Sequence, residues 1–150
     1  MWPLALLVGV LVLGALVMPV EVKAGVELEG LNLEHMAPVV AAVERVWSGY
    51  RVPAVITDAL RDPDADGRRS SKHAEGDALD FRIRNIERKF WEQAARAVAM
   101  QLNPVLYDVV LEIDNATPTA DAANRSHLHV EYDPRPSKIS RASGFSIMNI

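Results

Sequence analysis

The chain has 150 residues, with 16 Lys and Arg against 20 Asp and Glu, and 49% of its residues are hydrophobic. This length and balance fit one globular domain and exclude a disordered, collagen-like or coiled-coil chain. Because it has no cysteine, disulfides, thiolate nucleophiles and iron–sulfur clusters are excluded, and any metal must be held by His, Asp or Glu. The formal net charge of -4 provides no general attraction to nucleic acid, so we expect no nucleic-acid partner.

An uncharged segment opens the chain. Residues 2–20 (WPLALLVGVLVLGALVMPV) contain no ionisable side chain, and as a helix they extend about 28 Å, enough to cross the hydrocarbon core of a bilayer. Their internal glycines and proline disfavour a buried core helix. We therefore predict that residues 1–24, which contain this hydrophobic helix, are either a signal peptide or an uncleaved membrane anchor. The domain 25–150 is then extracytoplasmic, in the periplasm or cell envelope, either anchored or secreted.

A helix and a strand are predicted before the first polar loop. Asn32 is a suitable N-cap for a helix that ends near Gly49, although Pro38 favours a later start. The apolar residues that recur at helical spacing are Met36, Val40, Val43 and Trp47. The β-branched segment 52–60 predicts a buried strand, and residues 62–77, rich in turn formers and charge, predict a loop.

A second strand follows this loop. In residues 78–83 (ALDFRI), polar and apolar residues alternate, so that Leu79 and Phe81 share one face and Asp80 and Arg82 the other. If the apolar face is core, Asp80 points into a cleft.

One helix and two strands complete the predicted domain. A second helix is expected to begin near Asn85 and to end before Asn103-Pro104. Residues 107–113 (YDVVLEI) and 128–132 (LHVEY) predict two strands, separated by a polar loop. The tail 134–150 has no strong periodicity, and we expect it to be loosely attached.

The last predicted strand carries two histidines. Alternation places His127, His129 and Glu131 on one face, opposite an apolar face. With His73 and Asp80, these histidines would supply the neutral imidazoles and the carboxylate that Zn²⁺ binds, with a coordination position left for water. The alternative is that histidines near strand ends are surface residues without a metal.

A longer motif favours a metal site over surface histidines without a metal. Residues 71–80 (SKHAEGDALD) fit the pattern S-x-H-x-x-G-x-A-x-D at every fixed position, and a His-Leu-His follows at 127–129. Over about residues 30–133 the chain therefore resembles the LAS-type zinc peptidases, which include D-alanyl-D-alanine carboxypeptidases and phage endolysins. The resemblance implies that His73, Asp80 and His129 are the zinc ligands.

The resemblance also implies a fold. We expect an α+β domain of the Hedgehog/DD-peptidase type, with a small, mostly antiparallel sheet, helices on one face and the zinc cleft on the other. In the motif, Gly76 would permit a tight turn, and Ala78 would leave room beside the metal on the face of Asp80.

The general base departs from the common family pattern. Many members carry an acidic residue three positions before the last ligand, where this chain has Ser126. Other members carry His-x-His, so His127 is the first candidate for proton transfer. Glu112 is the second candidate, provided that its strand pairs antiparallel with the His-x-His strand; otherwise it is a solvated strand-end charge.

Two further features lie in or beside the first polar loop. Arg61 occupies the place where family members polarise the scissile carbonyl or hold substrate, and its alternative role is a surface charge paired with a neighbouring aspartate. Residues 62–67 (DPDADG) begin like a calcium loop. Its twelfth position, however, is His73 in place of a bidentate glutamate, so we interpret the segment as an acidic turn.

The expected activity is that of a hydrolase. The resemblance implies a zinc metallopeptidase that cuts peptidoglycan stem peptides, either as a D,D-carboxypeptidase or as an endolysin-type endopeptidase of the cell wall. One alternative is a wall-binding module that retains the metal but has no competent base. Another is a membrane-anchored interaction protein whose histidines are incidental.

Overall fold

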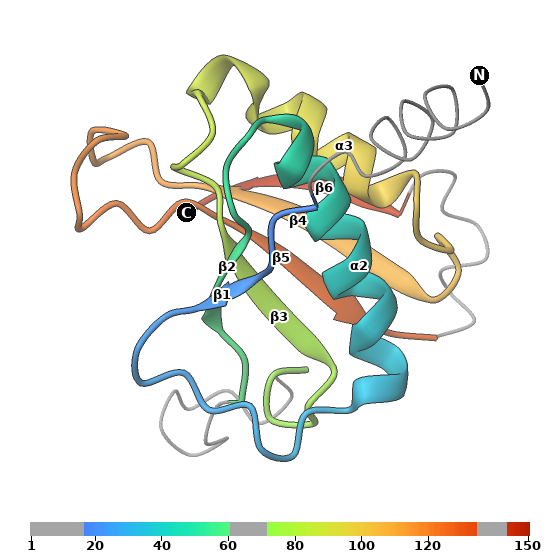
Figure 1. Cartoon of the computed structure of the whole chain (residues 1–150). Coiled ribbons are helices and arrows are strands. Elements are labelled where there is room, and N and C mark those ends of the chain that lie inside the picture. The colour runs from blue at the N-terminus through green and yellow to red at the C-terminus, as the bar shows by residue number, and fades with distance from the viewer. Residues whose placement is uncertain (1–16, 61–71, 135–143) are drawn as a thin grey trace, which may run out of the picture.

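A computed structural model describes residues 17–60, 72–134 and 144–150 of the chain (Figure 1). The described part is an α+β fold with a six-stranded sheet in the order β1-β2-β3-β5-β4-β6. Its elements are β1 (Glu21–Val22), α2 (Leu33–Gly49), β2 (Val55–Asp58), β3 (Ala78–Arg82), the 3-10 turn η1 (Arg88–Phe90), α3 (Trp91–Ala99), β4 (Tyr107–Ile113), β5 (His127–Tyr132) and β6 (Phe145–Asn149).

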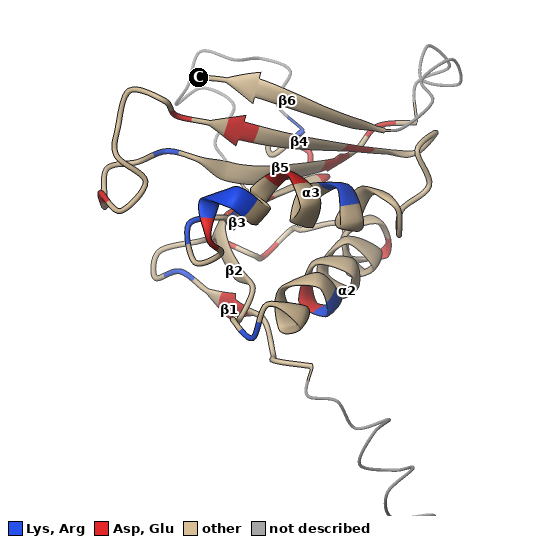
Figure 2. Ribbon diagram, turned by 90° about the horizontal axis from the view of Figure 1, so that it is seen from above, with Lys and Arg blue, Asp and Glu red and all other residues tan. Residues whose placement is uncertain are grey.

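The sheet is mixed. Its central pairings, β2 with β3, β3 with β5 and β4 with β5, are antiparallel. The outer pairings, β1 with β2 and β4 with β6, are parallel. Figure 2 shows β1 and β6 at opposite edges. The predicted α+β class is therefore confirmed, and the sheet is antiparallel in its centre with a parallel strand added at each side.

The core lies between one face of the sheet and the helices α2 and α3. Leu79 and Phe81 of β3 and Leu128 of β5 are fully buried in it, together with Trp47 of α2 and Val98 of α3. Burial of each such large apolar side chain contributes about 1.5–3 kcal/mol. Because side chains alternate along a strand, this core assigns Asp80 and His129 to the opposite face.

Three sequence-based boundaries differ from the structure. Helix α2 begins directly after Asn32 and continues through Pro38, whose side chain is exposed. The second helix is shorter than expected, because residues 88–90 form a 3-10 turn before α3. The tail was expected to be loose, but residues 145–149 form β6 and pair with β4.

The start of α2 is attached to the strands that carry the polar face. His35 Nδ1 lies 2.8 Å from Asp77 Oδ1, and the His35 ring stacks on Tyr132 at 3.6 Å. Next to Asp77, Gly76 has a φ of 76°, and a Cβ there would lie 2.6 Å from the carbonyl oxygen of Gly30. Only glycine therefore fits this turn, which connects His73 to β3.

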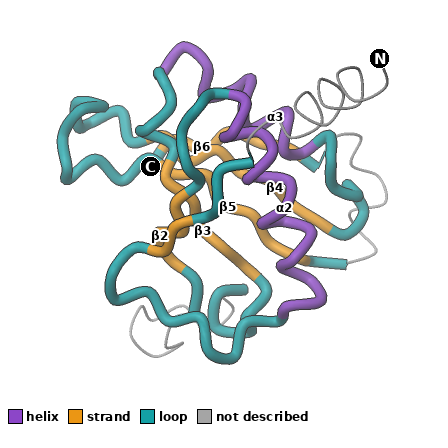
Figure 3. The backbone as a smooth tube through the Cα atoms, in the orientation of Figure 1, coloured by secondary structure: helices purple, strands orange, loops and turns teal. Residues whose placement is uncertain are grey.

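The predicted N-terminal hydrophobic helix lies mostly outside the described residues, which begin at residue 17. Among the described residues, no helix is long and apolar enough to span a membrane. Figure 3 shows that the loop between β4 and β5, residues 114–126, projects from one end of the sheet.

Candidate metal centre

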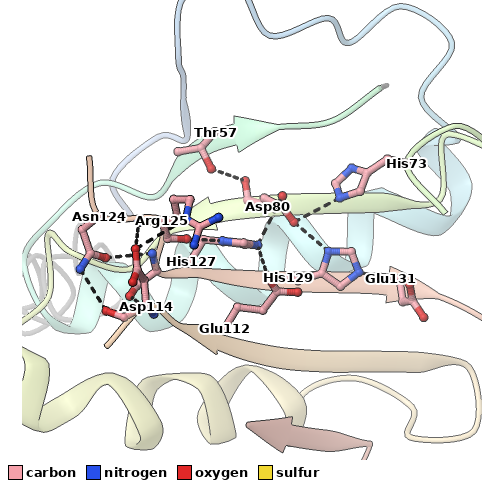
Figure 4. A network of polar contacts seen from close by, with 11 residues as sticks. Thr57, His73, Asp80, Glu112, Asp114, Asn124, Arg125, His127, His129 and Glu131 are labelled. Atoms are coloured by element: carbon pink, nitrogen blue, oxygen red, sulfur yellow. Dashed lines mark hydrogen bonds and ion pairs between the residues drawn. The ribbon is translucent and has the colours of Figure 1, made fainter. Parts of the chain in front are cut away.

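Three of the predicted ligands converge on the polar face of the sheet. Asp80 and His129 are cross-strand neighbours in the pairing of β3 with β5, and His73 lies in the turn before β3. Oδ1 of Asp80 is 2.8 Å from His129 Nδ1 and 3.2 Å from His73 Nε2 (Figure 4). Asp80 and His73 are each only 3% exposed. The three side chains therefore form a shielded cluster of one oxygen and two nitrogens.

In His73 and His129, the outer ring nitrogen, which is the one that does not contact Asp80, is hydrogen-bonded to an acceptor. His73 Nδ1 lies 2.5 Å from the carbonyl oxygen of Ala59, and His129 Nε2 lies 3.1 Å from Glu131 Oε2. A carbonyl or carboxylate oxygen only accepts, so these outer nitrogens are the donors. The nitrogens that face Asp80 also donate, to its carboxylate, and each must give up that proton before it can bind a metal. Such outer acceptors orient the histidine ligands of metal sites.

The donor set fits a tetrahedral metal ion such as zinc. Zinc–nitrogen and zinc–oxygen bonds of about 2.0–2.1 Å place the ligand atoms of a tetrahedron about 3.3 Å apart. The ligand atoms of His73, Asp80 and His129 all lie within 4.8 Å of one another, and the two nitrogen-to-Oδ1 distances are near the tetrahedral value. Three protein ligands are typical of a catalytic zinc site, which keeps its fourth position for water or substrate.

Asp80 and His129 form an ion pair within the cluster. Burial would raise the pKa of Asp80, but hydrogen bonds from His129 and His73 outweigh it and lower the pKa well below its usual range. Burial would lower the pKa of His129, but the hydrogen bonds to Asp80 and Glu131 outweigh it and raise the pKa to about 10. A metal must therefore displace a proton from this imidazole.

Both candidate bases lie beside the cluster and contact each other. Glu112 of β4 and His127 of β5 are cross-strand neighbours, as the predicted antiparallel pairing requires. His127 Nε2 is 3.2 Å from Glu112 Oε2 and 3.5 Å from Asp80 Oδ2. His127 Nδ1 donates to the carbonyl oxygen of Arg125 at 2.7 Å. Nε2 of His127 therefore faces both Glu112 and the cluster.

Ser126 has a structural role in the loop. Its buried hydroxyl accepts a hydrogen bond of 2.8 Å from the backbone N–H of Asp114. The Asp114 carboxylate accepts from the backbone N–H groups of Arg125 and Ala116, and these bonds lower its pKa. Ser126 thus closes the 114–126 loop, and the carboxylate beside His127 comes from Glu112 of β4.

A broad cleft surrounds the cluster. It has a volume of about 860 Å³ and lies over the polar face of the sheet and the end of the 114–126 loop. Arg82 and Arg84 line it. Arg84 precedes α3, and its Nη1 donates to the carbonyl oxygen of Asp121. Alternation along β3 already placed Arg82 beside Asp80, but its part in the cleft was not recognised.

Two predictions concern residues outside the described part of the chain. Arg61 and the calcium-like segment 62–67 both fall within residues 61–71. Glu131 Oε2 accepts from His129 Nε2, and Glu131 also belongs to a group of acids with Asp108 and Asp133. The carbonyl group of Ala59 carried no recognisable sequence signal.

No protein-family model, curated protein or solved structure matches this chain.

Proposed function

We propose that the chain is a zinc-dependent metallopeptidase that hydrolyses a peptide bond in peptidoglycan stem peptides, as a carboxypeptidase or an endopeptidase. The main support is the convergence of His73, Asp80 and His129 in one cleft, each histidine with its outer nitrogen bound. The motif at 71–80 and the His-x-His pair supply the resemblance to wall peptidases. A substrate in the cell wall also agrees with the extracytoplasmic location that residues 1–24 predict.

His73, Asp80 and His129 would hold the zinc. When bound, zinc supplies a water of lowered pKa and polarises the scissile carbonyl group. The remaining protein groups would bind the peptide along the cleft and exclude bulk water from the buried side of the cluster.

His127 would transfer the proton. Its Nε2 is the nitrogen that faces the cluster, and it would accept a proton from the attacking water and donate it to the leaving amine. Glu112, 3.2 Å from that nitrogen, would stabilise the imidazolium formed in between. The Arg125 carbonyl holds the ring in this orientation through Nδ1. Arg61 would stabilise the developing oxyanion, as the family resemblance implies.

Digestion of purified peptidoglycan tests this proposal. Full-length chain is incubated with zinc, with or without a chelator, and the released fragments are identified by mass spectrometry. We expect peptide fragments only in the zinc-containing reaction, and their masses identify the bond that is cut. Asp80→Asn should abolish the release. His35→Gln, which changes the histidine outside the cluster, should not.

One observation favours a second candidate. The acid that many family members carry is replaced by Ser126, whose hydroxyl is used within the loop. A wall-binding module would retain zinc and bind peptidoglycan without cutting it. Zinc-loaded chain that sediments with peptidoglycan but releases no fragment would support this candidate over the peptidase.

A further inference from the structure

The cleft is more cationic than the chain as a whole. Of the described residues, five cationic side chains and three side-chain carboxylates line it, although the formal net charge of the chain is -4. The three carboxylates each contact a histidine. The cationic lining residues are Lys23, Lys72, Arg82, Arg84 and Arg125. An excess of cations in a cleft attracts an anionic substrate.

Arg82 differs from the other arginines of the cleft. Arg84 donates to the carbonyl oxygen of Asp121, and Arg125 is 71% exposed and lies 3.6 Å from Asp114. Arg82 is partly buried in the cleft wall, and none of the described residues forms a hydrogen bond or ion pair with its guanidinium group. A partly buried guanidinium presents several donors in a fixed plane that matches a carboxylate.

The position of Arg82 places it on the leaving-group side of the scissile bond in the proposed reaction. It follows Asp80 by two residues on β3, so the two Cα atoms are separated by about 6.7 Å, or two residue steps of an extended peptide. Its cross-strand neighbour on β5 is His127, the group that the proposed function assigns to protonation of the leaving amine. The residue that follows the scissile bond would therefore lie beside Arg82.

We infer that Arg82 forms an anion subsite that binds a carboxylate on the leaving side of the substrate. This inference rests on the proposed function for the position of the scissile bond. The carboxylate is either the α-carboxylate of a C-terminal residue or the side-chain carboxylate of an acidic residue. In both cases the guanidinium group orients the substrate and selects it against neutral peptides, and it takes no part in proton transfer.

The test compares three probe peptides. Nα,Nε-diacetyl-L-Lys-D-Ala-D-Ala carries a terminal carboxylate as its only charge, and its C-terminal amide is the neutral match. N-acetyl-L-Ala-D-Glu α-amide carries only a side-chain carboxylate. Hydrolysis is measured with the zinc-loaded chain, and binding is measured by NMR titration with the chelator-treated chain, because a carboxylate would otherwise bind the metal itself. The variants are Arg82→Gln, Arg82→Lys and, as a control, Arg96→Gln on the exposed side of α3.

We expect the wild-type chain to prefer one of the carboxylate peptides over the neutral amide by about 10- to 100-fold in kcat/KM and in affinity. Arg82→Gln should remove this preference, chiefly by raising KM for the carboxylate peptide. Arg82→Lys should keep part of it, and Arg96→Gln should keep all of it. The preferred carboxylate peptide identifies the source of the anion.

Two results would overturn the inference: no preference for a carboxylate in the wild-type chain, or a preference that survives in Arg82→Gln. Failure of the proposed function has a different signature. In that case no peptide is cut, yet the chelator-treated chain still binds a carboxylate peptide through Arg82.

Discussion

The carboxylate of Glu112 lies 3.2 Å from Nε2 of His127, on the neighbouring strand and at the same level of the sheet. Both side chains are about one-fifth exposed, at 22% and 20%, so each reaches the cleft while contacting the other. The two candidate bases thus form one unit in which the histidine faces the metal cluster and the glutamate faces the histidine.

This unit predicts unequal effects of two substitutions. His127→Gln should lower kcat for stem-peptide hydrolysis by about 10²- to 10⁴-fold, because the proton-transfer group is removed. Glu112→Gln should have a smaller effect, because the imidazole remains. Both variants should retain zinc, which metal analysis of the same samples checks. A larger loss in Glu112→Gln than in His127→Gln would instead identify the glutamate as the base.

Glu131 should affect zinc affinity without binding the metal. Its carboxylate accepts from His129 Nε2 at 3.1 Å and so orients the ring. We expect Glu131→Gln to weaken zinc binding by about 10- to 100-fold, as measured by competition with a chromogenic chelator. Glu92→Gln, on the exposed side of α3, is the matched control and should bind zinc normally. Equal affinities for the two variants would count against this role.

Zinc binding should release about one proton near neutral pH. Because the pKa of His129 is raised to about 10, zinc has to displace the proton of its Nδ1, the nitrogen that faces Asp80. We therefore expect the zinc association constant to rise about tenfold per pH unit up to that value. Calorimetry in two buffers with different ionisation enthalpies measures the number of protons released, and a value near zero would contradict the ion-pair structure of the metal-free site.

The same ion pair predicts how the stability of the chelator-treated chain changes with pH. The pKa of His129 is raised from 6.5 to about 10, so its stabilising contribution is complete below pH 6.5 and is lost as pH rises through about 10. The pKa of Asp80 is lowered from 3.8, so its contribution is present above pH 3.8 and is lost as pH falls below that value.

Thermal unfolding at a series of pH values measures this dependence. We expect the free energy of unfolding of the chelator-treated chain to decrease from about pH 7 to about pH 10. In His129→Gln the decrease should be much smaller, because the group that loses its proton is absent. An equally steep decrease in the variant would assign the effect to other residues.

Alanine substitutions at Gly76 and Gly25 distinguish the cost of backbone strain from that of a steric clash. Both have positive φ, at 76° and 85°, so alanine costs about 1 kcal/mol at either position. Only at Gly76 would the new Cβ meet an atom, the Gly30 carbonyl oxygen at 2.6 Å, since nothing lies within 4 Å of the Cβ at Gly25. Gly76→Ala should therefore destabilise the chain more in urea unfolding and also weaken zinc binding by displacing His73.

The local pattern of the sequence predicts most of the elements that carry the site. Alternation in 78–83 and 127–132 assigned Asp80 and His129 to the polar face. The antiparallel pairing of 107–113 with 128–132, on which the role of Glu112 depended, is present in the structure. These strands are predictable because each buries one face, which imposes a period of two.

Other features depend on contacts between distant segments. Strand β6 pairs with β4 at an edge and has mostly exposed side chains, so no hydrophobic pattern marks it. The Ala59 carbonyl group beside His73 depends on how a loop approaches β2, and a backbone group carries no residue signature. Ser126 was considered only as a missing acid, because its bond to the Asp114 N–H depends on the conformation of the 114–126 loop.

The most direct test of the central claim is the zinc content of the purified full-length chain after dialysis against metal-free buffer. The account predicts about one zinc per chain in the wild type and in His35→Gln, and none in His73→Ala, Asp80→Asn or His129→Ala variants that remain folded by circular dichroism. A wild-type chain without zinc after incubation with the metal, or folded ligand variants that retain it, would contradict the account.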